Sequence, residues 1–353
     1  NLGSFVTTEV VVTSSVRMYP SAKGWFFFAL CLVILSTFFF TGYISQTLEV
    51  KSERSADEPP EPNGLPPCGE VCTYGGRVTE IPGNFFLQRR KRIECNNIMK
   101  RMAYRGHPVI FPPPTYPPAN LIDEFTMFGD MPISKMWYFD ANWTAEPKTF
   151  SSIQMDAIIK SMNKGNCINM YQDNKCVQNM LIKYKNEIRG KSGVVIGTEL
   201  PWLEGLVLGY GAGNVTTLEY ATITTELPNM AAYTPYDYAD KYLKGEVKKF
   251  DFAASFSSIE HSGLGRYTDP LNPYGDLEAM AQVWCMLKPG AIFGVGIPAE
   301  PDDSNYIIWN ANRVYGSKRL QYLAANWDFV EMTQCPDIFH HYFIILRKPR
   351  KHM

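Results

Sequence analysis

Apolar residues in the second half of this 353-residue chain show two alternating patterns. Short continuous runs predict strands, and a spacing of three or four residues predicts helices. Short apolar runs predict strands at 193–197, 215–220, 250–255, 291–297 and 342–346. Apolar residues that recur every three or four positions predict helices over 151–162, 176–188, 201–210, 276–287 and 320–327. Strands that alternate with helices imply a mostly parallel sheet with helices on both faces, so residues 131–353 are predicted to form an α/β domain.

A different pattern lies near the N-terminus, where residues 24–48 contain no charged side chain. About 20 apolar residues suffice to cross a hydrocarbon core of roughly 30 Å. Trp25 and Tyr43 lie near the ends of the run, where aromatic rings favour the membrane interface. The run is longer than the apolar part of a cleaved signal peptide, which has about 7–15 residues. We therefore predict a single transmembrane anchor at 24–46 that remains in the protein.

The charges around this anchor do not decide its orientation, because Arg17 and Lys23 precede it and Lys51 and Arg54 follow it. The orientation must therefore be predicted from the larger, C-terminal part of the chain.

Two features favour a lumenal position for that part. Sequons at 142–144 and 214–216 offer acceptors for N-linked glycans. Closely spaced cysteines can form disulfides in an oxidising compartment, whereas Cys285 is predicted to be a buried thiol. The two candidate pairs are Cys68 with Cys72 and Cys167 with Cys176. The prediction is a type II membrane protein of the endoplasmic reticulum or Golgi.

Composition divides the rest of the chain. Residues 1–23 form a polar tail, and 47–67 form an acidic, Pro-rich stem that buries too little apolar area to order itself. Residues 68–130 form a Cys- and Pro-rich extension that is predicted to be loop-like. Its Pro-rich stretch at 108–118 is predicted to wrap the protein's own fold, and 347–351 is predicted to be a solvated tail.

The charge balance argues against one class of function. Lys and Arg total 34, and Asp and Glu total 35, which gives a formal net charge of −1. A protein held to nucleic acid by phosphate charge usually has a basic excess, so no nucleic-acid partner is predicted. Hydrophobic residues make up 45%, which is too many for a mainly disordered chain.

Candidate site residues follow from the sheet, because open parallel sheets bind ligands beyond the carboxyl ends of their strands. The turn at 197–202 follows the first strand of the α/β region and opens a helix. Glu219 ends the second strand, 22 residues after Gly197. Nucleotide-binding sheets place an acceptor for ribose hydroxyls at about this distance. The position of Glu219 can equally be explained without a ligand, because acidic residues are common at the ends of strands.

The densest polar cluster is the loop at 255–270, which follows the strand FDFAAS. Glu260 and His261 are residue types that act as general bases or bind polar substrate groups. The structural alternative is that Glu260, His261 and Arg266 tie down a long loop by mutual hydrogen bonds. We favour a functional role, because polar loops beside a sheet edge are commonly functional.

Other polar groups are assigned structural roles. Glu199 and Glu204 could form a carboxylate pair, but an acid in the first turn of a helix ordinarily compensates the helix dipole. Adjacent His340 and His341 point to opposite faces of a strand and make a poor metal pair. No Cys or His spacing in the sequence suggests zinc, so no metal site is predicted.

The order of these features resembles that of a class I S-adenosylmethionine-dependent methyltransferase. The corresponding stretches are VVIG before a turn and helix, a strand ending in Glu219, FDFAAS before a His-bearing loop, and LKPGAIFGVGIP after a helix. Three stretches further resemble an uncharacterised family, domain of unknown function 268: GTELPWLEGLVLGYGAGNVTTLEY, SIEHSGLGRYTDPLNPYGDLEAMAQVW and NRVYGSKRLQYLAANW. The resemblance covers roughly residues 190–330 and implies a methyltransferase-like Rossmann domain with S-adenosylmethionine as its cofactor.

The resemblance also implies roles for single residues. Glu219 would bind the ribose hydroxyls of the cofactor. Glu199 and Pro201 depart from the family pattern, because they stand where two glycines of a glycine-rich turn would lie. A carboxylate at 199 can accept a hydrogen bond from the cofactor's ammonium group, but it repels the cofactor's carboxylate. The other implied cofactor residues are Gly197, Thr198, Ser257 and Ser258.

The leading hypothesis is a membrane-anchored methyltransferase-like enzyme whose acceptor is a glycan or small molecule. His261 or Glu260 would take the acceptor's proton, with Arg266 in the same catalytic loop. One alternative is a non-catalytic Rossmann scaffold for a partner or glycan, motivated by the missing glycines. The other is a nucleotide-sugar-dependent transferase, because Glu219 would hold any ribose, although the sequence contains no D-x-D metal motif.

Overall fold

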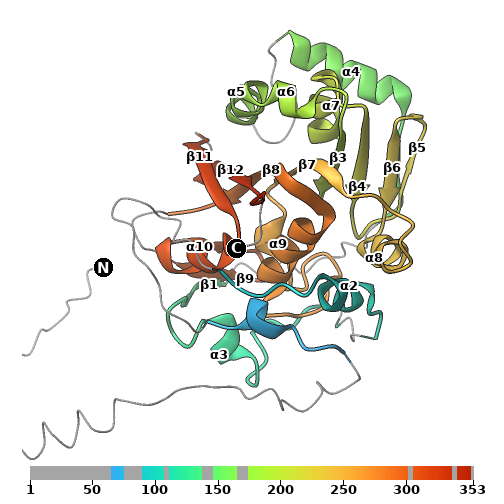
Figure 1. Cartoon of the computed structure of the whole chain (residues 1–353). Helices are drawn as coiled ribbons and strands as arrows, with labels where there is room; N and C mark the ends of the chain where they lie inside the picture. The colour runs from blue at the N-terminus through green and yellow to red at the C-terminus, as the bar shows by residue number, and fades with distance from the viewer. Residues whose placement is uncertain are drawn as a thin grey trace, which may run out of the picture. The chain divides into compact units, whose positions relative to one another are not determined.

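A mostly parallel sheet of seven strands forms the centre of the fold (Figure 1). Its order is β11-β12-β8-β7-β3-β4-β6. The strands are β3 (Ser192–Ile196), β4 (Asn214–Leu218), β6 (Met230–Tyr233), β7 (Phe250–Phe256), β8 (Leu287–Pro298), β11 (Asp328–Gln334) and β12 (His341–Arg347). The first five are parallel, whereas β12 runs antiparallel to β8 and β11 antiparallel to β12. From β3 the chain proceeds to β4 and β6 and then returns to β7, so the strand order reverses between β3 and β7.

The structure is a computed structural model of the chain. It describes residues 65–74, 90–106, 110, 112–136, 146–164, 174–300, 305–335 and 340–350, all within one compact unit that extends from Pro59 to Met353. The predicted anchor at 24–46, the sequon at 142–144 and Cys167 lie outside the described residues. Within the part that is described, no helix is long and apolar enough to cross a membrane.

Both faces of the sheet are buried, because successive side chains of its central strands enter two different cores. In β3, Val194 packs in one core and Val195 in the other. The first core includes residues of α2 (Cys95–Ala103), α8 (Pro235–Leu243), α9 (Gly275–Met286) and α10 (Ser317–Leu323). The second includes residues of α4 (Ser152–Asn163), α5 (Lys175–Lys183), α6 (Lys185–Ile188) and α7 (Trp202–Gly209). The predicted α/β fold, with helices on both faces of a mostly parallel sheet, is therefore confirmed.

Shorter elements surround this sheet. A small three-stranded sheet contains β1 (Ile133–Met136), β9 (Tyr306–Trp309) and β10 (Asn312–Val314), and a two-stranded sheet pairs β2 (Lys148–Phe150) with β5 (Ile223–Thr225). The remaining helical turns are η1 (Gly69–Cys72), α3 (Ile122–Phe125) and η2 (Ile259–His261). Trp309 Nε1 donates to the carbonyl of Pro114 at 2.9 Å, so this part of the Pro-rich stretch packs against the protein's own fold, as predicted.

Two helix predictions need correction. The helix expected over 176–188 is divided at Tyr184 into α5 and α6. The extension at 68–130 was expected to be loop-like, yet it contains the nine-residue helix α2. That helix buries Ile98, Met99 and Met102 against the domain, and this tertiary packing stabilises a short segment rich in Asn and basic residues.

The cysteine predictions are partly wrong. Cys68 pairs with Cys72, as expected. Cys176 pairs with Cys335, 159 residues away, and not with Cys167. Cys285 is not a buried thiol, because it pairs with Cys95 across 190 residues. Spacing along the sequence favoured local partners, whereas the fold brings distant segments together.

The beginning of the predicted solvated tail is integrated into the domain. Arg347 lies in β12 and donates to both carboxylate oxygens of Glu187, at 2.7 and 2.9 Å. Lys348 is buried and donates to the carbonyls of Trp284 and Leu287, at 2.6 and 2.8 Å. Burial lowers the pKa of Lys348 to about 8. A cation near the C-terminus of α9 is favourable because it binds carbonyls that the helix leaves unpaired.

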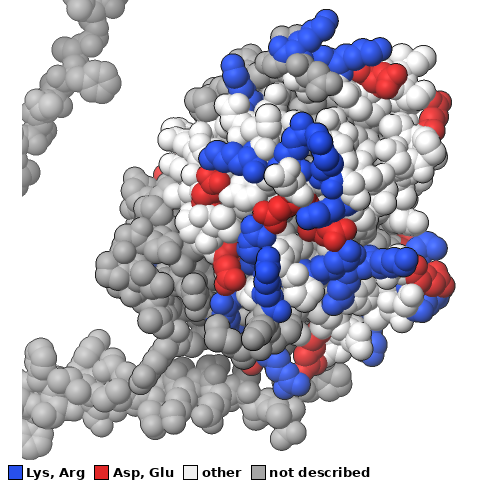
Figure 2. Space-filling view, turned by 45° about the horizontal axis from the view of Figure 1, so that its top comes forward, with Lys and Arg blue, Asp and Glu red and all other residues white. Residues whose placement is uncertain are grey.

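On the outer surface, acidic side chains lie among the lysines and arginines of the face that Figure 2 shows. This mixed distribution agrees with the near-neutral composition.

Candidate functional site

A cavity of about 760 Å³ opens at the carboxyl ends of β3, β4 and β7, beside the reversal in strand order. Open α/β sheets bind their ligands at this place, because the loops after neighbouring strands diverge there. The loops after these strands line the cavity together with one face of α9. The α9 residues recur at helical spacing: Gly275, Glu278, Ala279, Gln282, Val283 and Met286.

The turn after β3 meets the loop after β7 at the floor of this cavity. Gly197 has a φ of +69°, and a Cβ at this position would overlap the side chain of Ser258. Gly197 is therefore required both for the left-handed backbone conformation of the turn and for the close approach of Ser258 to its backbone. Thr198 and Glu199 line the cavity beside it. The predicted cofactor residues of the two loops thus lie together.

Glu219 follows β4 directly and connects that strand to the turn. Its Oε2 accepts from the Thr198 N–H at 2.8 Å, and its Oε1 accepts from the Tyr220 N–H at 2.7 Å. Burial raises the pKa of the carboxyl, although these backbone donors oppose the rise. A carboxylate offers about four acceptor positions. A third backbone contact, from the Ala221 N–H to Oε1, is long at 3.5 Å and therefore weak. Glu219 can thus hold the turn in place and still accept from neighbouring hydroxyls of a ligand.

Glu204 lies beneath the same turn and is completely buried, so it does more than compensate a helix dipole. Thr217 Oγ1 donates to its Oε1 at 2.9 Å, and Thr198 Oγ1 lies 3.4 Å from its Oε2. Burial raises the pKa of Glu204 to about 7. Since Thr198 Oγ1 donates its proton to the carbonyl of Leu200 at 2.6 Å, a protonated Glu204 can donate to Thr198. Glu204 thereby supports the cavity floor from below.

Aromatic and apolar side chains line the cavity next to Glu219. The rings of Tyr220 and Tyr236 meet edge to face, with centroids 5.9 Å apart. Leu218, Val283 and Met286 supply apolar surface in the same cavity. A flat, partly apolar ring that is joined to a diol would find matching surfaces here, as small-molecule sites require.

The loop after β7 is held in shape by Asp269, whose role the sequence did not reveal. Its buried carboxylate accepts from the N–H groups of Gly263 at 2.6 Å, Tyr267 at 3.1 Å and Gly265 at 3.3 Å. Ser257, at the start of the loop, has a φ of +52°, an uncommon conformation for a residue with a side chain. Asp269 therefore ties down this long loop by hydrogen bonds, a structural role that the sequence analysis considered for Glu260, His261 and Arg266.

The structure places Glu260 and His261 differently. His261 lines the cavity, whereas Glu260 is fully buried beside it and accepts from Ser257 Oγ at 2.9 Å. His261 Nδ1 lies 2.5 Å from the carbonyl of Ala311, so Nδ1 carries the proton and Nε2 is free to accept one. Nε2 lies 3.6 Å from Glu260 Oε1. His341 is buried on the other side of Glu260, at 3.7 Å from the same oxygen.

The protonation of His261 gives a testable prediction. Burial lowers the pKa of His261 to about 4, although the charge of Glu260 opposes this shift. We expect the ε1 carbon signal of His261, identified by its loss in His261→Asn, to titrate in NMR with a midpoint near pH 4. Because an unfolded His binds its proton at about pH 6.5, this residue lowers the stability of the fold as the pH falls from about 6.5 to 4. A midpoint near the ordinary value would contradict the neutral, buried state.

Arg266 also lines the cavity, but its guanidinium supports the wall. It donates to the carbonyl of Ala311 at 3.1 Å and lies over the ring of Tyr267, 5.0 Å from its centroid. Both Arg266 and His261 thus contact the carbonyl of Ala311.

The cavity carries more negative than positive groups. Five carboxylates line it, from Glu146, Glu199, Glu219, Asp269 and Glu278. Three cationic side chains oppose them, from Arg101, Lys148 and Arg266. Such an excess favours a cationic or neutral ligand over a polyphosphate.

Sequence reasoning missed the residues that α2 contributes. Arg101, Met102 and Tyr104 line the cavity from a segment that precedes the sheet by about 90 residues. No sequence motif identifies these residues. The nearby Cys95, which pairs with Cys285 of α9, is the one residue that could have linked this segment to the site. The Cys68 and Cys72 sulfurs lie close to Glu278, but a disulfide leaves no thiolate to bind a metal ion.

The fold and site define an α/β protein with a cavity at the carboxyl edge of its mostly parallel sheet. Residues 190–336 match the family model described as "Caenorhabditis protein of unknown function, DUF268", which confirms the resemblance seen in the sequence. No curated protein matches the chain.

Solved structures are similar to about half of the chain. A putative hemolysin from Streptococcus thermophilus is 13% identical, with 49% of this chain and 65% of that chain covered and a TM-score of 0.35. The N-methyltransferase NodS from Bradyrhizobium japonicum, in complex with S-adenosyl-L-homocysteine, is 12% identical over 56% and 98% of the two chains, with a TM-score of 0.33. A putative SAM-dependent methyltransferase from Streptococcus mutans is 11% identical over 50% and 49%, with a TM-score of 0.31.

Proposed function

We propose that this protein binds S-adenosylmethionine and transfers its methyl group to a polar acceptor. The observation that carries the proposal is Glu219, a partly buried carboxylate next to the reversal in strand order, which is tied to the Gly197 turn and lines a cavity with more acidic than basic side chains. Such a carboxylate suits the vicinal hydroxyls of a ribose.

The residues of the cavity fit the parts of this cofactor. Glu219 would bind the ribose, and Tyr220 and Tyr236 would contact the purine. Glu199 would accept from the ammonium group at the methionine end, next to Gly197, whose missing side chain allows the close approach. When bound, S-adenosylmethionine supplies an electrophilic methyl group on a positively charged sulfur.

The charge of the cavity favours this cofactor over the alternative of a nucleotide-sugar donor. The pyrophosphate of a nucleotide sugar would face five carboxylates against three cationic groups. The sulfonium and ammonium groups of S-adenosylmethionine would instead be attracted to them. We therefore rank the nucleotide-sugar alternative lower.

His261 is the proposed base for the acceptor. Its Nδ1–H is held by the Ala311 carbonyl, which orients Nε2 as the proton acceptor. When Nε2 takes the proton of an acceptor hydroxyl, the imidazolium forms 3.6 Å from Glu260 Oε1 and is stabilised by that carboxylate. Glu260 thus acts through His261 and does not itself meet the acceptor.

We further propose that the protein is anchored in a membrane of the secretory pathway, with this domain in the lumen and a glycan hydroxyl among its candidate acceptors. Three disulfides support this proposal, because two of them join segments 190 and 159 residues apart and such bridges persist in oxidising compartments. Asn214, in the second sequon, is exposed at the start of β4.

The test is calorimetric titration of the full chain in detergent with S-adenosylhomocysteine and, separately, with uridine diphosphate. We expect heat of binding with the first ligand and none with the second. The His261→Asn variant should bind S-adenosylhomocysteine like wild type but fail to transfer labelled methyl groups to glycoproteins of a membrane extract. A folded wild type that binds neither ligand would rule out the cofactor. Binding without transfer by wild type would favour the non-catalytic scaffold.

A further inference from the structure

Part of the cavity wall comes from a segment that precedes residues 190–336. We call this segment the N-terminal strap and define it as residues 65–74 and 90–106. Its helix α2 packs against α8 and α9. Arg101 and Met102 of α2 and Tyr104 line the same cavity as the predicted cofactor residues.

Two contacts fasten α2 to α9, one near each end. Cys95, the first residue of α2, forms a disulfide with Cys285 near the end of α9. Arg101 donates from Nη2 to Glu278 Oε1 at 2.8 Å and from Nε to Oε2 at 3.2 Å. The contacts are six residues apart on α2 and seven on α9, so the two helices run antiparallel and are joined at points about 10 Å apart.

The face of α9 between these contacts is also a cavity wall. Ala279, Gln282 and Val283 lie between Glu278 and Cys285 and line the cavity. A movement of α2 away from α9 would therefore open the cavity along this face.

We propose that the Cys95–Cys285 disulfide holds the N-terminal strap closed over the cofactor, so that the oxidised protein retains its ligand and the reduced protein releases it. This inference rests on the proposed function, because it takes S-adenosylmethionine or its product as the ligand. Reduction by a dithiol would supply two electrons and two protons, convert the S–S bond to two thiols, and leave the reductant as a cyclic disulfide.

The disulfide is the covalent attachment of α2 to α9, and the exposed contacts of this segment add little to it. A nine-residue helix is too short to hold its own conformation, so α2 depends on its attachment to the domain. Arg105 pairs with Asp237 and Asp240 of α8 at 2.9 Å, but these groups are exposed and such pairs contribute little. The buried Arg101–Glu278 pair remains after reduction, together with the packing of Ile98 and Met99.

The test compares two double variants of the full chain. Cys95→Ser with Cys285→Ser removes the strap disulfide, and Cys176→Ser with Cys335→Ser removes a disulfide of similar loop length among residues that pack on the other face of the sheet. Dissociation of S-adenosylhomocysteine is measured by stopped-flow tryptophan fluorescence. We expect the first variant to release the ligand about tenfold faster than wild type and the second to match wild type.

A second measurement covers the case in which the first variant does not fold. Hydrogen exchange at 95–103 is followed without ligand in a variant that keeps only the Cys95–Cys285 disulfide (Cys68, Cys72, Cys176 and Cys335 each changed to Ser), before and after addition of dithiothreitol. It is expected to accelerate more than exchange in β3. Equal dissociation rates in both double variants, or unchanged exchange in α2 after reduction, would overturn the proposal. Absence of any S-adenosylhomocysteine binding by wild type would instead refute the proposed function, and the exchange measurement would still decide whether the disulfide holds the strap.

Discussion

Glu219→Ala is expected to weaken binding of S-adenosylhomocysteine by about 100-fold, because it removes two hydrogen bonds from ribose hydroxyls to a charged acceptor, each of which is worth about 1.5 kcal/mol or more. The variant also leaves the Thr198 N–H without the carboxylate that now accepts from it at 2.8 Å. The turn that carries Gly197 and Glu199 would then be less well fixed. Calorimetric titration of the full chain measures the loss directly.

The matched control is Glu246→Ala. Glu246 is half-exposed and pairs with Lys241 at 3.5 Å, so its removal leaves the cavity intact. We expect this control to bind the ligand like wild type. The melting temperature of each variant establishes that the comparison is between folded proteins. Unchanged affinity in Glu219→Ala would contradict the assignment of the cofactor site to the carboxyl edge of the sheet.

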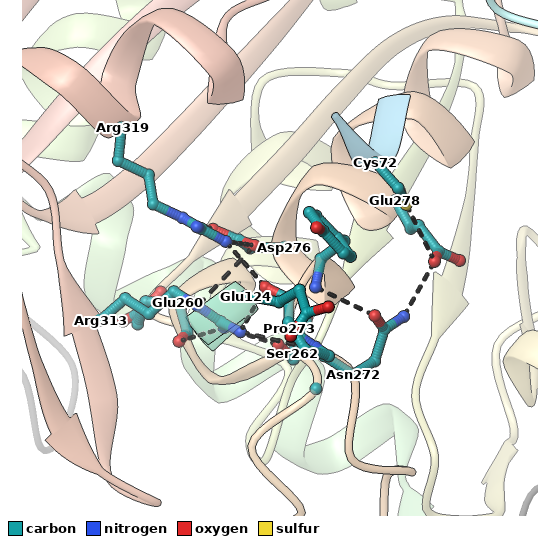
Figure 3. A network of polar contacts seen from close by, with 12 residues as sticks. Cys72, Glu124, Glu260, Ser262, Asn272, Pro273, Asp276, Glu278, Arg313 and Arg319 are labelled. Carbon is teal, nitrogen blue, oxygen red and sulfur yellow. Dashed lines mark hydrogen bonds and ion pairs between the residues drawn. The ribbon is translucent and has the colours of Figure 1, made fainter. Parts of the chain in front are cut away.

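Asp276→Ala is expected to lower the free energy of unfolding by about 3–5 kcal/mol, because it leaves two buried guanidinium groups without their compensating negative charge. Asp276, Arg313 and Arg319 are all completely buried, and Figure 3 shows both arginines converging on the start of α9. Arg319 donates to the two carboxylate oxygens of Asp276 at 2.6 and 3.0 Å. Arg313 Nε lies 3.8 Å from Asp276 Oδ1. Although burial opposes ionisation, these arginines lower the pKa of Asp276.

The corresponding surface pair provides the control. Asp130 and Lys318 are about half-exposed and lie 2.7 Å apart. Asp130→Ala should cost at most about 1 kcal/mol, because water solvates both charges when they separate. Urea unfolding of the oxidised protein, followed by circular dichroism, measures both variants. Equal losses would mean that the buried network does not stabilise the fold in the way that its geometry indicates.

The same network connects the stability of the fold to the candidate site. Arg313 donates to the carbonyl of Ser262 at 2.6 Å, and Arg319 donates to the carbonyl of Pro273 at 3.0 Å. The Ser262 carbonyl belongs to the polar loop that carries His261, and the Pro273 carbonyl lies between that loop and α9. A loss of Asp276 would therefore also release the loop that positions the proposed base.

Much of the fold was predictable because burial on a regular element leaves a local pattern. The predicted strands at 193–197, 250–255 and 342–346 coincide closely with β3, β7 and β12. The position of Glu219 followed from the same pattern, since a strand must end before a residue can stand at the sheet edge. These inferences needed no information beyond neighbouring residues.

Other features depend on partners that are distant in sequence, and no local pattern specifies them. Cys285 looked like a buried thiol, and only the fold brings Cys95 beside it. Lys348 looked like part of a solvated tail, yet the end of α9 offers it two carbonyls. Glu260 looked like a candidate base, but the packing of the loop against β12 and His341 buries it behind His261.

The sequence by itself determined the α/β class, the order of most strands and helices, and the chemical types that gather at the carboxyl edge of the sheet. These features depend on periods of two and of three to four residues, which adjacent side chains fully encode. The tertiary structure alone decided which of those groups face the cavity, which cysteines pair, and that α2 forms a wall of the pocket. The reason is physical, because burial, proximity and charge compensation depend on segments that meet only when the chain has folded.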